Sequence, residues 1–359
     1  MTHETELTMV KGNEAIGEAA IRSGCRFFFG YPITPQSELP AYMARRMPEV
    51  KGTYLQAESE LAAINMVLGA SAAGARVMTS SSSPGFSLKQ EGISYMIGSQ
   101  LPAVVVNIMR GGPGLGNIQP GQADYFQMVK GGGHGDYHMI ALAPSTVQEL
   151  VDLTSLAFEL ADKYQNPVGI LGDGLLGQTM EPVRFPDLQQ DPGPEAKPWA
   201  LTGANGRAKR FHTSLELSPE ALERHNVKLQ AKFAEMKKNE ARWEEYKCED
   251  AQLVVVAFGT SARVARAAVE SARQQGYRVG LLRPITVWPF PSEALSALVD
   301  RGVTMFLDVE MNAGQMVEDV QLAVLGRAKV EFYGRTGGMV PTPREVLNEI
   351  MKVMGGEAK

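Results

Sequence analysis

The sequence is poor in cysteine and in long apolar runs, and each shortage excludes a class of protein. Its 359 residues include two cysteines, Cys25 and Cys248, which lie far apart. Two distant thiols provide neither a disulfide framework, nor a paired zinc motif, nor the four-thiolate ligand set of an iron–sulfur cluster. No run of about 18 apolar residues occurs, and the first residues lack a basic start followed by an apolar stretch. We therefore expect a cytoplasmic protein without a membrane span.

The sequence also lacks an excess of basic residues. Lys and Arg number 35 against 40 Asp and Glu, which gives a formal net charge of −5. This balance disfavours nucleic-acid binding. A hydrophobic fraction of 44% is typical of globular proteins, and the length corresponds to about two domains. The 37 glycines and 21 prolines favour strand-to-helix turns over a helical bundle.

Short apolar runs alternate with helical periods over residues 12–173. Such alternation is typical of strands that are buried on both faces of a parallel sheet wrapped by helices. It predicts an α/β domain over residues 1–181, in which ligands bind beyond the carboxyl ends of the strands. The predicted strands are 27–31, 54–57, 76–80, 103–109, 139–143 and 167–171, and the predicted helices are 13–23, 37–47, 60–73, a segment after 84–85, and 146–164.

Residues 182–250 break this alternation. A proline-rich linker covers 181–213, and Ser218 followed by Pro219 then predicts the start of a helix. Apolar residues continue at seven-residue spacing through Leu222, Leu229, Met236 and Trp243. This pattern predicts a long amphipathic helix, for which packing on its own chain is favoured over packing on a partner. Alternating runs resume at 253 and predict a second, smaller α/β domain over 251–359.

Two motifs admit plain structural interpretations. The serine-rich turn at 79–85 lacks the first glycine of a nucleophile elbow, which favours a turn that caps a helix. The glycine segment 111–116 does not match a dinucleotide-binding spacing.

A second glycine-rich segment, at 131–138, carries possible metal ligands. His134, Asp136 and His138 lie within it. One histidine–aspartate pair in a glycine loop more often shapes the rim of a cavity than binds a metal, so we assign no metal-binding residue to this chain.

Three segments combine into a candidate site. They are YPITPQ at 31–36, QAESELAA at 56–63 and the strand that ends at Arg110. Each falls where a strand ends, so in a parallel sheet a carboxylate, a hydroxyl and a guanidinium could share one cleft. Helix-capping acids and a surface arginine are an equally open interpretation.

These segments resemble the alpha-type subunit of the 2-oxoacid:ferredoxin oxidoreductases over nearly the whole chain. The resemblance extends to GNEA at 12–15, GASAAG at 69–74, SPGF at 83–86 and DVEMNAGQM at 308–316. It implies two doubly wound, mostly parallel-sheet α/β domains. The first would have the pyrimidine-type thiamin diphosphate-binding fold, and the second would resemble the transketolase C-terminal domain.

The resemblance also implies how the cofactor is bound. Glu60 would contact the ring nitrogen of the aminopyrimidine, and Pro32 and Ile33 would line its pocket. A buried carboxylate can share a proton with that nitrogen, which water would prevent. Glu58, two positions earlier, is the alternative, and Glu60 fits the family pattern better.

Thr34 and Arg110 would lie beside the substrate carboxylate. A guanidinium suits a planar carboxylate because it offers two parallel N–H groups, whereas an ammonium offers a single point charge.

The sequence lacks a convincing diphosphate-binding segment. Gly172-Asp173-Gly174 resembles the start of the family motif, but a proline-rich linker follows, so we interpret it as the turn after the last strand. The resemblance therefore places the diphosphate and Mg²⁺ on a beta-type partner and [4Fe-4S] clusters on a ferredoxin-like partner, with a gamma-type subunit in the same complex. The chain alone would be inactive.

The implied reaction is the oxidative decarboxylation of a 2-oxoacid to an acyl-coenzyme A, with electrons passed to ferredoxin. The segments 110–127 and 131–138 resemble members assigned to branched-chain oxoacids such as 2-oxoisovalerate. Two alternatives stay open: 2-oxoglutarate as the substrate, and a structural subunit without a catalytic role.

Overall fold

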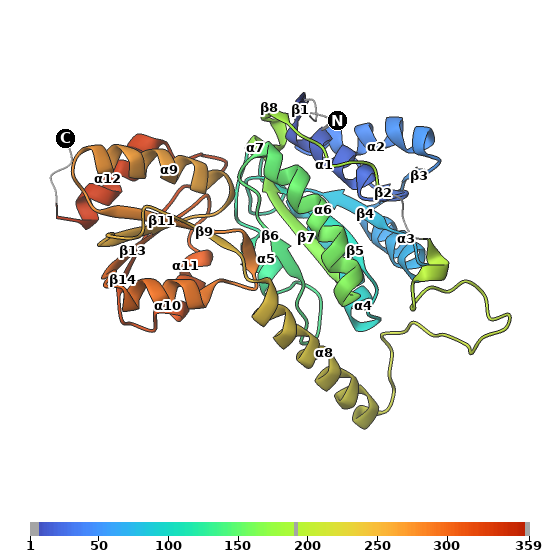
Figure 1. Ribbon diagram of the computed structural model, residues 1–359. Helices are drawn as coiled ribbons and strands as arrows, with labels where there is room; N and C mark the ends of the chain where they lie inside the picture. The colour runs from blue at the N-terminus through green and yellow to red at the C-terminus, as the bar shows by residue number, and fades with distance from the viewer. Residues whose placement is uncertain (1–6, 190–192, 356–359) are drawn as a thin grey trace, which may run out of the picture.

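The computed structural model describes residues 7–189 and 193–355 and contains two open α/β sheets (Figure 1). The first sheet has seven strands in the order β12-β6-β7-β5-β4-β2-β3. The second has five, in the order β14-β13-β10-β11-β9, and β1 and β8 form a separate pair. The predicted class of two mostly parallel α/β sheets is confirmed.

The first sheet is parallel except at one edge, where β12 runs antiparallel to β6. Every residue of β5 and β7 is buried, as the apolar runs predicted. Its strands are β2 (Phe27–Gly30), β3 (Thr53–Gln56), β4 (Val77–Ser81), β5 (Ala103–Met109), β6 (Ile140–Leu142), β7 (Pro167–Asp173) and β12 (Thr286–Trp288). Its helices are α1 (Gly12–Arg22), α2 (Glu38–Arg46), α3 (Glu60–Ala72), α4 (Ser83–Gly98), α5 (Tyr125–Val129), α6 (Val147–Tyr164) and α7 (Gly174–Gln178).

The second sheet carries helices on both faces, α9 and α12 on one and α10 and α11 on the other (Figure 1). It is parallel except for the edge strand β9. Its strands are β9 (Trp243–Tyr246), β10 (Leu253–Val256), β11 (Val279–Pro284), β13 (Met305–Glu310) and β14 (Lys329–Gly334). Its helices are α9 (Gly259–Gln274), α10 (Ser292–Asp300), α11 (Met316–Val324) and α12 (Pro343–Val353).

The long helix is shorter than its apolar spacing predicted. Helix α8 (Pro219–Glu240) starts after Ser218, as expected, but Trp243 lies on β9 and is 42% exposed. The chain leaves the helix at Ala241 because the following residues pair with β11. Leu229, Phe233 and Met236 are buried on the chain itself, which confirms the predicted own-chain packing. No helix in the described part of the chain has the length and apolar character to cross a bilayer.

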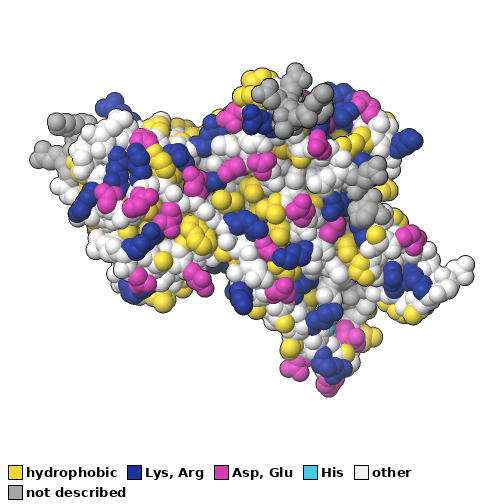
Figure 2. All heavy atoms as spheres, in the orientation of Figure 1, with side chains coloured by type: hydrophobic (Ala, Val, Ile, Leu, Met, Phe, Trp, Pro, Cys, Tyr) yellow, Lys and Arg dark blue, Asp and Glu magenta, His cyan; other side chains and the backbone are white. Residues whose placement is uncertain are grey.

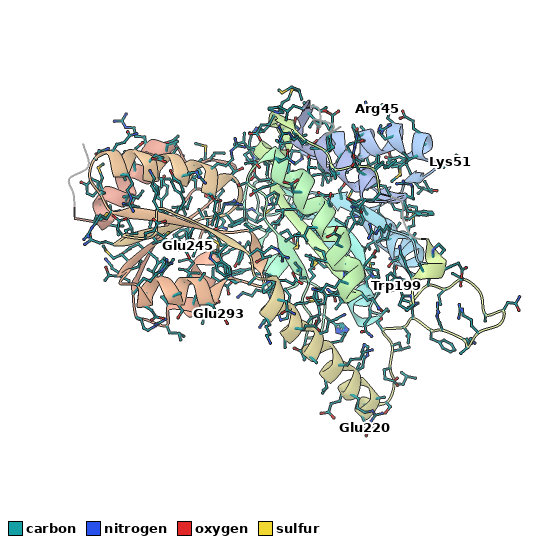
Figure 3. All side chains as sticks on the ribbon, in the orientation of Figure 1. Arg45, Lys51, Trp199, Glu220, Glu245 and Glu293 are labelled. Carbon is teal, nitrogen blue, oxygen red and sulfur yellow. The ribbon has the colours of Figure 1, made fainter. Side chains whose placement is uncertain are left out.

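The proline-rich segment is more ordered than a linker. Met180–Val183 form β8, which pairs antiparallel with β1 (Thr8–Lys11), and a short 3-10 turn covers Pro194–Ala196. Trp199 then packs back on the first sheet's helices, where its indole nitrogen donates to the Ser71 carbonyl at 3.3 Å (Figure 3). Neither contact had a signal in the apolar pattern.

Strand β12 links the two halves of the chain. It falls in the segment predicted as the second domain, yet it pairs with β6 and extends the first sheet. Trp288 stacks on His138 with ring centroids 4.7 Å apart, and Phe233 of α8 meets both rings edge-on. The domain boundaries at 181 and 250 stay predictions.

We predict that Phe233→Ala lowers the free energy of unfolding by about 3–5 kcal/mol, because it leaves a cavity against His138 and Trp288. Leu217→Ala is the control, since that side chain is 85% exposed. Chemical denaturation of both variants measures the difference. Equal midpoints for the two variants would show that α8 contributes no packing to this cluster.

Candidate active site

Glu60 begins α3 and faces the interior. Ser59 precedes it as the N-cap, with its hydroxyl accepting from the Ala62 amide at 3.2 Å. Glu60 is 4% exposed, and its Oε1 accepts a hydrogen bond from the Ser81 hydroxyl of β4 at 3.3 Å. Glu58 is exposed. The structure thus separates the two candidate carboxylates, and the buried one lies at the carboxyl end of the first sheet.

Gly85 brings the first turn of α4 against this carboxylate. A Cβ atom at position 85 would overlap Glu60 Oε1 and Ser81 Oγ. The absence of a side chain therefore lets α3, β4 and α4 meet around Glu60. The close contact with Glu60 and Ser81 thus explains the glycine of the SPGF segment, which the sequence alone did not.

Arg110 follows β5 directly and is 9% exposed. Its Nη1 donates to the Thr34 carbonyl at 3.0 Å and its Nη2 to the Leu115 carbonyl at 2.9 Å. Its Nε has no hydrogen-bond acceptor among the described residues. The structure brings Arg110 and the 32–34 turn together, with Pro32 and Thr34 exposed and Ile33 half-buried.

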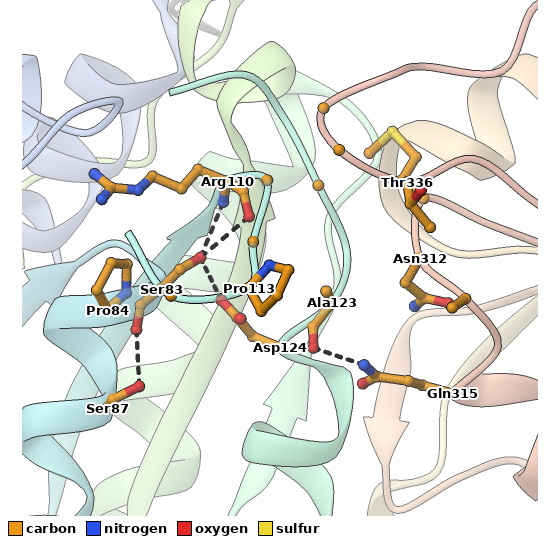
Figure 4. Close-up of a pocket in the computed structure, with 18 residues that line it drawn as sticks. Ser83, Pro84, Ser87, Arg110, Pro113, Ala123, Asp124, Asn312, Gln315 and Thr336 are labelled. Atoms are coloured by element: carbon orange, nitrogen blue, oxygen red, sulfur yellow. Dashed lines mark hydrogen bonds between the residues drawn. The ribbon is translucent and has the colours of Figure 1, made fainter. Parts of the chain in front are cut away.

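A polar network that the sequence did not reveal supports Arg110. The Ser83 hydroxyl donates to Asp124 Oδ2 at 2.6 Å and accepts from the Arg110 amide at 3.0 Å (Figure 4). The Asn107 side chain also binds Asp124 Oδ2, at 2.9 Å. Burial raises the pKa of Asp124, whereas the bonds from Ser83 and Asn107 and the charge of Arg110 act in the opposite direction. The network links β5, α4 and the 111–124 loop.

A cavity of about 820 Å³ opens between the two halves of the chain, beside this network. Ser83, Arg110 and Asp124 line one side, and Asn312 and Gln315 face them from the second half (Figure 4). Among the described residues that line the cavity, Arg110 is the only cation. Glu60 is not among these residues. The cavity therefore adjoins Arg110 and not the buried glutamate.

Gln122 holds the two walls of the cavity together. Its side chain accepts from Ser261 at 2.7 Å and from the Met311 amide at 3.0 Å, and donates to the Phe258 carbonyl at 2.9 Å. The side-chain amide of Asn312 donates to the Gln122 backbone carbonyl at 2.8 Å. The DVEMNAGQM motif at 308–316 thus builds the second wall.

Asp173 of the Gly-Asp-Gly segment ends β7 and caps α7. Its Oδ1 accepts from the amides of Leu175 and Leu176 at 2.9 and 3.1 Å. Burial raises the pKa of Asp173, against the bonds it accepts. Gly172-Asp173-Gly174 thus forms the turn from β7 into α7, and the binding of the diphosphate by another chain stays a prediction.

His134 and Asp136 are exposed in the glycine loop. Both line a second cavity, of about 450 Å³, together with residues of α4 and α8. Within residues 7–189 and 193–355, no group of three or more His, Cys, Asp or Glu side chains is placed to hold a metal ion.

Two known protein families match the chain. Residues 18–252 match the thiamine diphosphate-binding family of pyruvate flavodoxin/ferredoxin oxidoreductases, which is more than half of the chain. Residues 251–346 match core domain II of pyruvate:ferredoxin oxidoreductase. The chain belongs to the 2-oxoacid:ferredoxin oxidoreductases. The resemblance drawn from its motifs is confirmed.

Individual members of this oxidoreductase family align along almost the whole chain. Ketoisovalerate oxidoreductase subunit VorB of Methanothermobacter marburgensis is 54% identical and aligns over 97% of this chain and 98% of its own length. 2-Oxoglutarate synthase subunit KorA of Methanothermobacter thermautotrophicus is 37% identical and aligns over 97% of this chain and 99% of its own length.

Solved structures agree with the oxidoreductase fold. The 2-oxoglutarate:ferredoxin oxidoreductase of Magnetococcus marinus, solved with 2-oxoglutarate, coenzyme A and succinyl-CoA bound, is 29% identical, with a TM-score of 0.88. The match covers 97% of this chain and 65% of that longer one. A split-gene transketolase, an inactive beta4 tetramer, shares the fold alone, at 15% identity and a TM-score of 0.62.

We predict that Gly85→Ala impairs cofactor-dependent activity at least about tenfold, because the new methyl group must displace Glu60 or Ser81. Gly69→Ala is the matched control: it lies in the same region on α3, and a Cβ there meets no atom within 4 Å. Turnover of the assembled complex, with circular dichroism to verify folding, measures the effect. Equal activity in both variants would contradict a steric role for Gly85.

Proposed function

We propose that this chain is the alpha-type subunit of a thiamin diphosphate-dependent oxidoreductase that acts on branched-chain 2-oxoacids, with 2-oxoisovalerate as the representative substrate. The observation that carries the proposal is the 54% identity to a ketoisovalerate oxidoreductase subunit over essentially the full length of both chains. The products are carbon dioxide, an acyl-coenzyme A and reduced ferredoxin.

The residues around Glu60 fit the aminopyrimidine half of thiamin diphosphate. Glu60 is buried with a hydroxyl donor beside it, and Gly85 lets the α4 backbone approach its carboxylate without a clash. Two further buried polar atoms of this region, Gln36 Nε2 and Ser82 Oγ, have no hydrogen-bond partner among the described residues. Unpaired buried polar groups are costly, so their presence favours a bound polar group.

Each site residue then has one task. Glu60 holds a proton at the ring nitrogen, and Pro32 and Ile33 form part of the pocket wall. Arg110 and Thr34 receive the substrate carboxylate at the carboxyl end of the sheet. The cofactor, when bound, supplies the carbon nucleophile that attacks the oxoacid carbonyl and the electron sink for the loss of carbon dioxide.

A partner is proposed to complete this edge of the sheet. Large apolar side chains are exposed around the strand ends: Tyr31, Leu55, Leu61, Leu115 and Ile118. Exposed apolar groups gathered beside a site mark a protein interface. The beta-type subunit, with the diphosphate and Mg²⁺, is the proposed occupant.

Iron–sulfur clusters are assigned to a ferredoxin-like subunit, since both cysteines of this chain are buried. A gamma-type subunit completes the proposed complex. The cytoplasm is the proposed location, because ferredoxin and coenzyme A are soluble reactants.

The lining of the cavity favours a monocarboxylate over 2-oxoglutarate. Arg110 is the only cation among its described lining residues, and Asp124 adds an acidic group. A second substrate carboxylate would lose its hydration there without gaining a cationic partner.

We therefore predict that the assembled complex has a kcat/KM for 2-oxoisovalerate at least about tenfold above that for 2-oxoglutarate. The assay uses both oxoacids and pyruvate, each with coenzyme A and a low-potential dye. A preference for 2-oxoglutarate would assign the alternative substrate. No turnover with any oxoacid would favour the structural-subunit alternative.

We predict that Glu60→Gln lowers kcat about 10²- to 10⁴-fold with assembly intact, because an amide has the size of the carboxyl but cannot hold the proton. Glu58→Gln is the matched control, since that side chain is exposed two positions earlier. Steady-state turnover and size-exclusion chromatography measure both effects. A larger loss in Glu58→Gln would move the role to that residue.

A further inference from the structure

Lys89 is a fully buried lysine next to the candidate site, with no task in the reaction described above. It lies on α4 with 0% of its surface exposed. Its ammonium donates to the Thr79 hydroxyl of β4 at 3.0 Å. Burying an ammonium against a neutral hydroxyl is costly unless an opposite charge compensates it.

The fold aligns Lys89 with Glu60. Gly85 and Lys89 are four residues apart on α4, so they lie on the same face of the helix, about 6 Å apart along its axis. Thr79 and Ser81 are two residues apart on β4, so their side chains point to the same side of the sheet, about 7 Å apart. Gly85 and Ser81 both adjoin Glu60, whereas Lys89 is bonded to Thr79. The ammonium therefore lies about one helical turn behind the glutamate carboxylate.

Glu60 is the charged group that acts on Lys89 through space. Burial lowers the pKa of Lys89 to about 7, and the charge of Glu60 raises it against that effect. From β4 the facing group is the neutral hydroxyl of Thr79, and the adjacent carboxylate on α4, Glu91, is exposed. Coulomb attraction is mutual, so the Lys89 ammonium attracts the Glu60 carboxylate in turn.

We propose that Lys89 is a positioning residue for the reaction: its buried ammonium stabilises the Glu60 carboxylate and thereby favours the shared proton on the cofactor's ring nitrogen. The inference rests on the proposed role of Glu60. An opposite charge near one partner of a shared proton shifts that proton toward the other partner. As pH rises through neutrality the ammonium loses its proton, and this assistance is lost.

The test is proton exchange at the thiazolium carbon of thiamin diphosphate, measured by acid quench and NMR in the assembled complex. Lys89→Met keeps an unbranched side chain that is one atom shorter and removes the charge. We expect exchange to slow about 10- to 50-fold. Lys89→Arg should recover part of the rate. Lys232→Met is the matched control. Lys232 on α8 is half-buried and burial lowers its pKa to about 8, but it lies outside the site.

A double-mutant cycle separates this inference from the proposed function. If Lys89 acts through Glu60, then Lys89→Met has no further effect in the Glu60→Gln background. Slow exchange in Glu60→Gln with a normal rate in Lys89→Met would overturn the role of Lys89 alone. A normal rate in Glu60→Gln would overturn the role of Glu60 itself.

A binding measurement provides a test that does not depend on turnover. Calorimetric titration with thiamin diphosphate and Mg²⁺ should show similar affinities for wild-type and Lys89→Met complexes, since the contact is indirect. A loss of affinity above about tenfold, without slower exchange in the bound fraction, would assign Lys89 to binding and overturn the proposal.

The wild-type complex alone provides a test that requires no variant. Its own exchange rate should show a downward step as pH rises through about 7, where the Lys89 ammonium loses its proton. A wild-type profile without a step near neutral pH would overturn the inference, even if Lys89→Met did not assemble.

Discussion

The structure of the candidate site depends on one close approach: α4 passes directly over the carboxylate that begins α3. Gly85 permits it, since any side chain there would occupy the place of Glu60 Oε1. Ser81 of β4 completes the contact with a hydrogen bond. Because the three elements are fixed by a buried parallel sheet, the carboxylate has one position, and the positions of the hydroxyl and ammonium groups behind it follow from that geometry.

A second constraint fixes the two halves of the chain to one another. Strand β12 adds to the first sheet, and the Gln122 side chain bonds to three residues in two segments of the second half. The cavity beside Arg110 lies between walls that these contacts hold. A site built from two interlocked sheets keeps its shape better than one formed by loops alone.

The sequence predicted those parts of the fold that depend on local pattern. Strands β5 and β7 are mostly apolar and were predicted, and so was the cap at Ser218. Trp243 was misassigned because its spacing continued a helix while its pairing partner, β11, lies far ahead in the chain. Strand β12 was missed for the same reason, since its partner β6 belongs to the other half. Pairing between distant segments leaves no local periodicity.

The same limit applies to the candidate site. Motifs at strand ends predicted that Arg110 and the 32–34 turn lie at one edge of a parallel sheet, and the family resemblance singled out Glu60; their roles stay proposals. Asp124 and Lys89 carry no motif, and their importance is visible only when their burial and partners are known.

The edge of the first sheet that carries the site combines unpaired buried polar atoms with exposed apolar side chains. Unpaired polar atoms of Gln36, Ser82 and Arg110 and a buried lysine gather where apolar side chains such as Leu115 stay exposed. Each of these features costs stability in an isolated chain, since the unpaired polar atoms lack partners, the buried ammonium has lost its hydration and apolar surface meets water. A cofactor and a partner that supplied the missing contacts would recover that cost on binding, so the free energy of assembly and the order of the site would be coupled. In the proposed complex the folded chain would thus hold half of the site in place, and association would complete it.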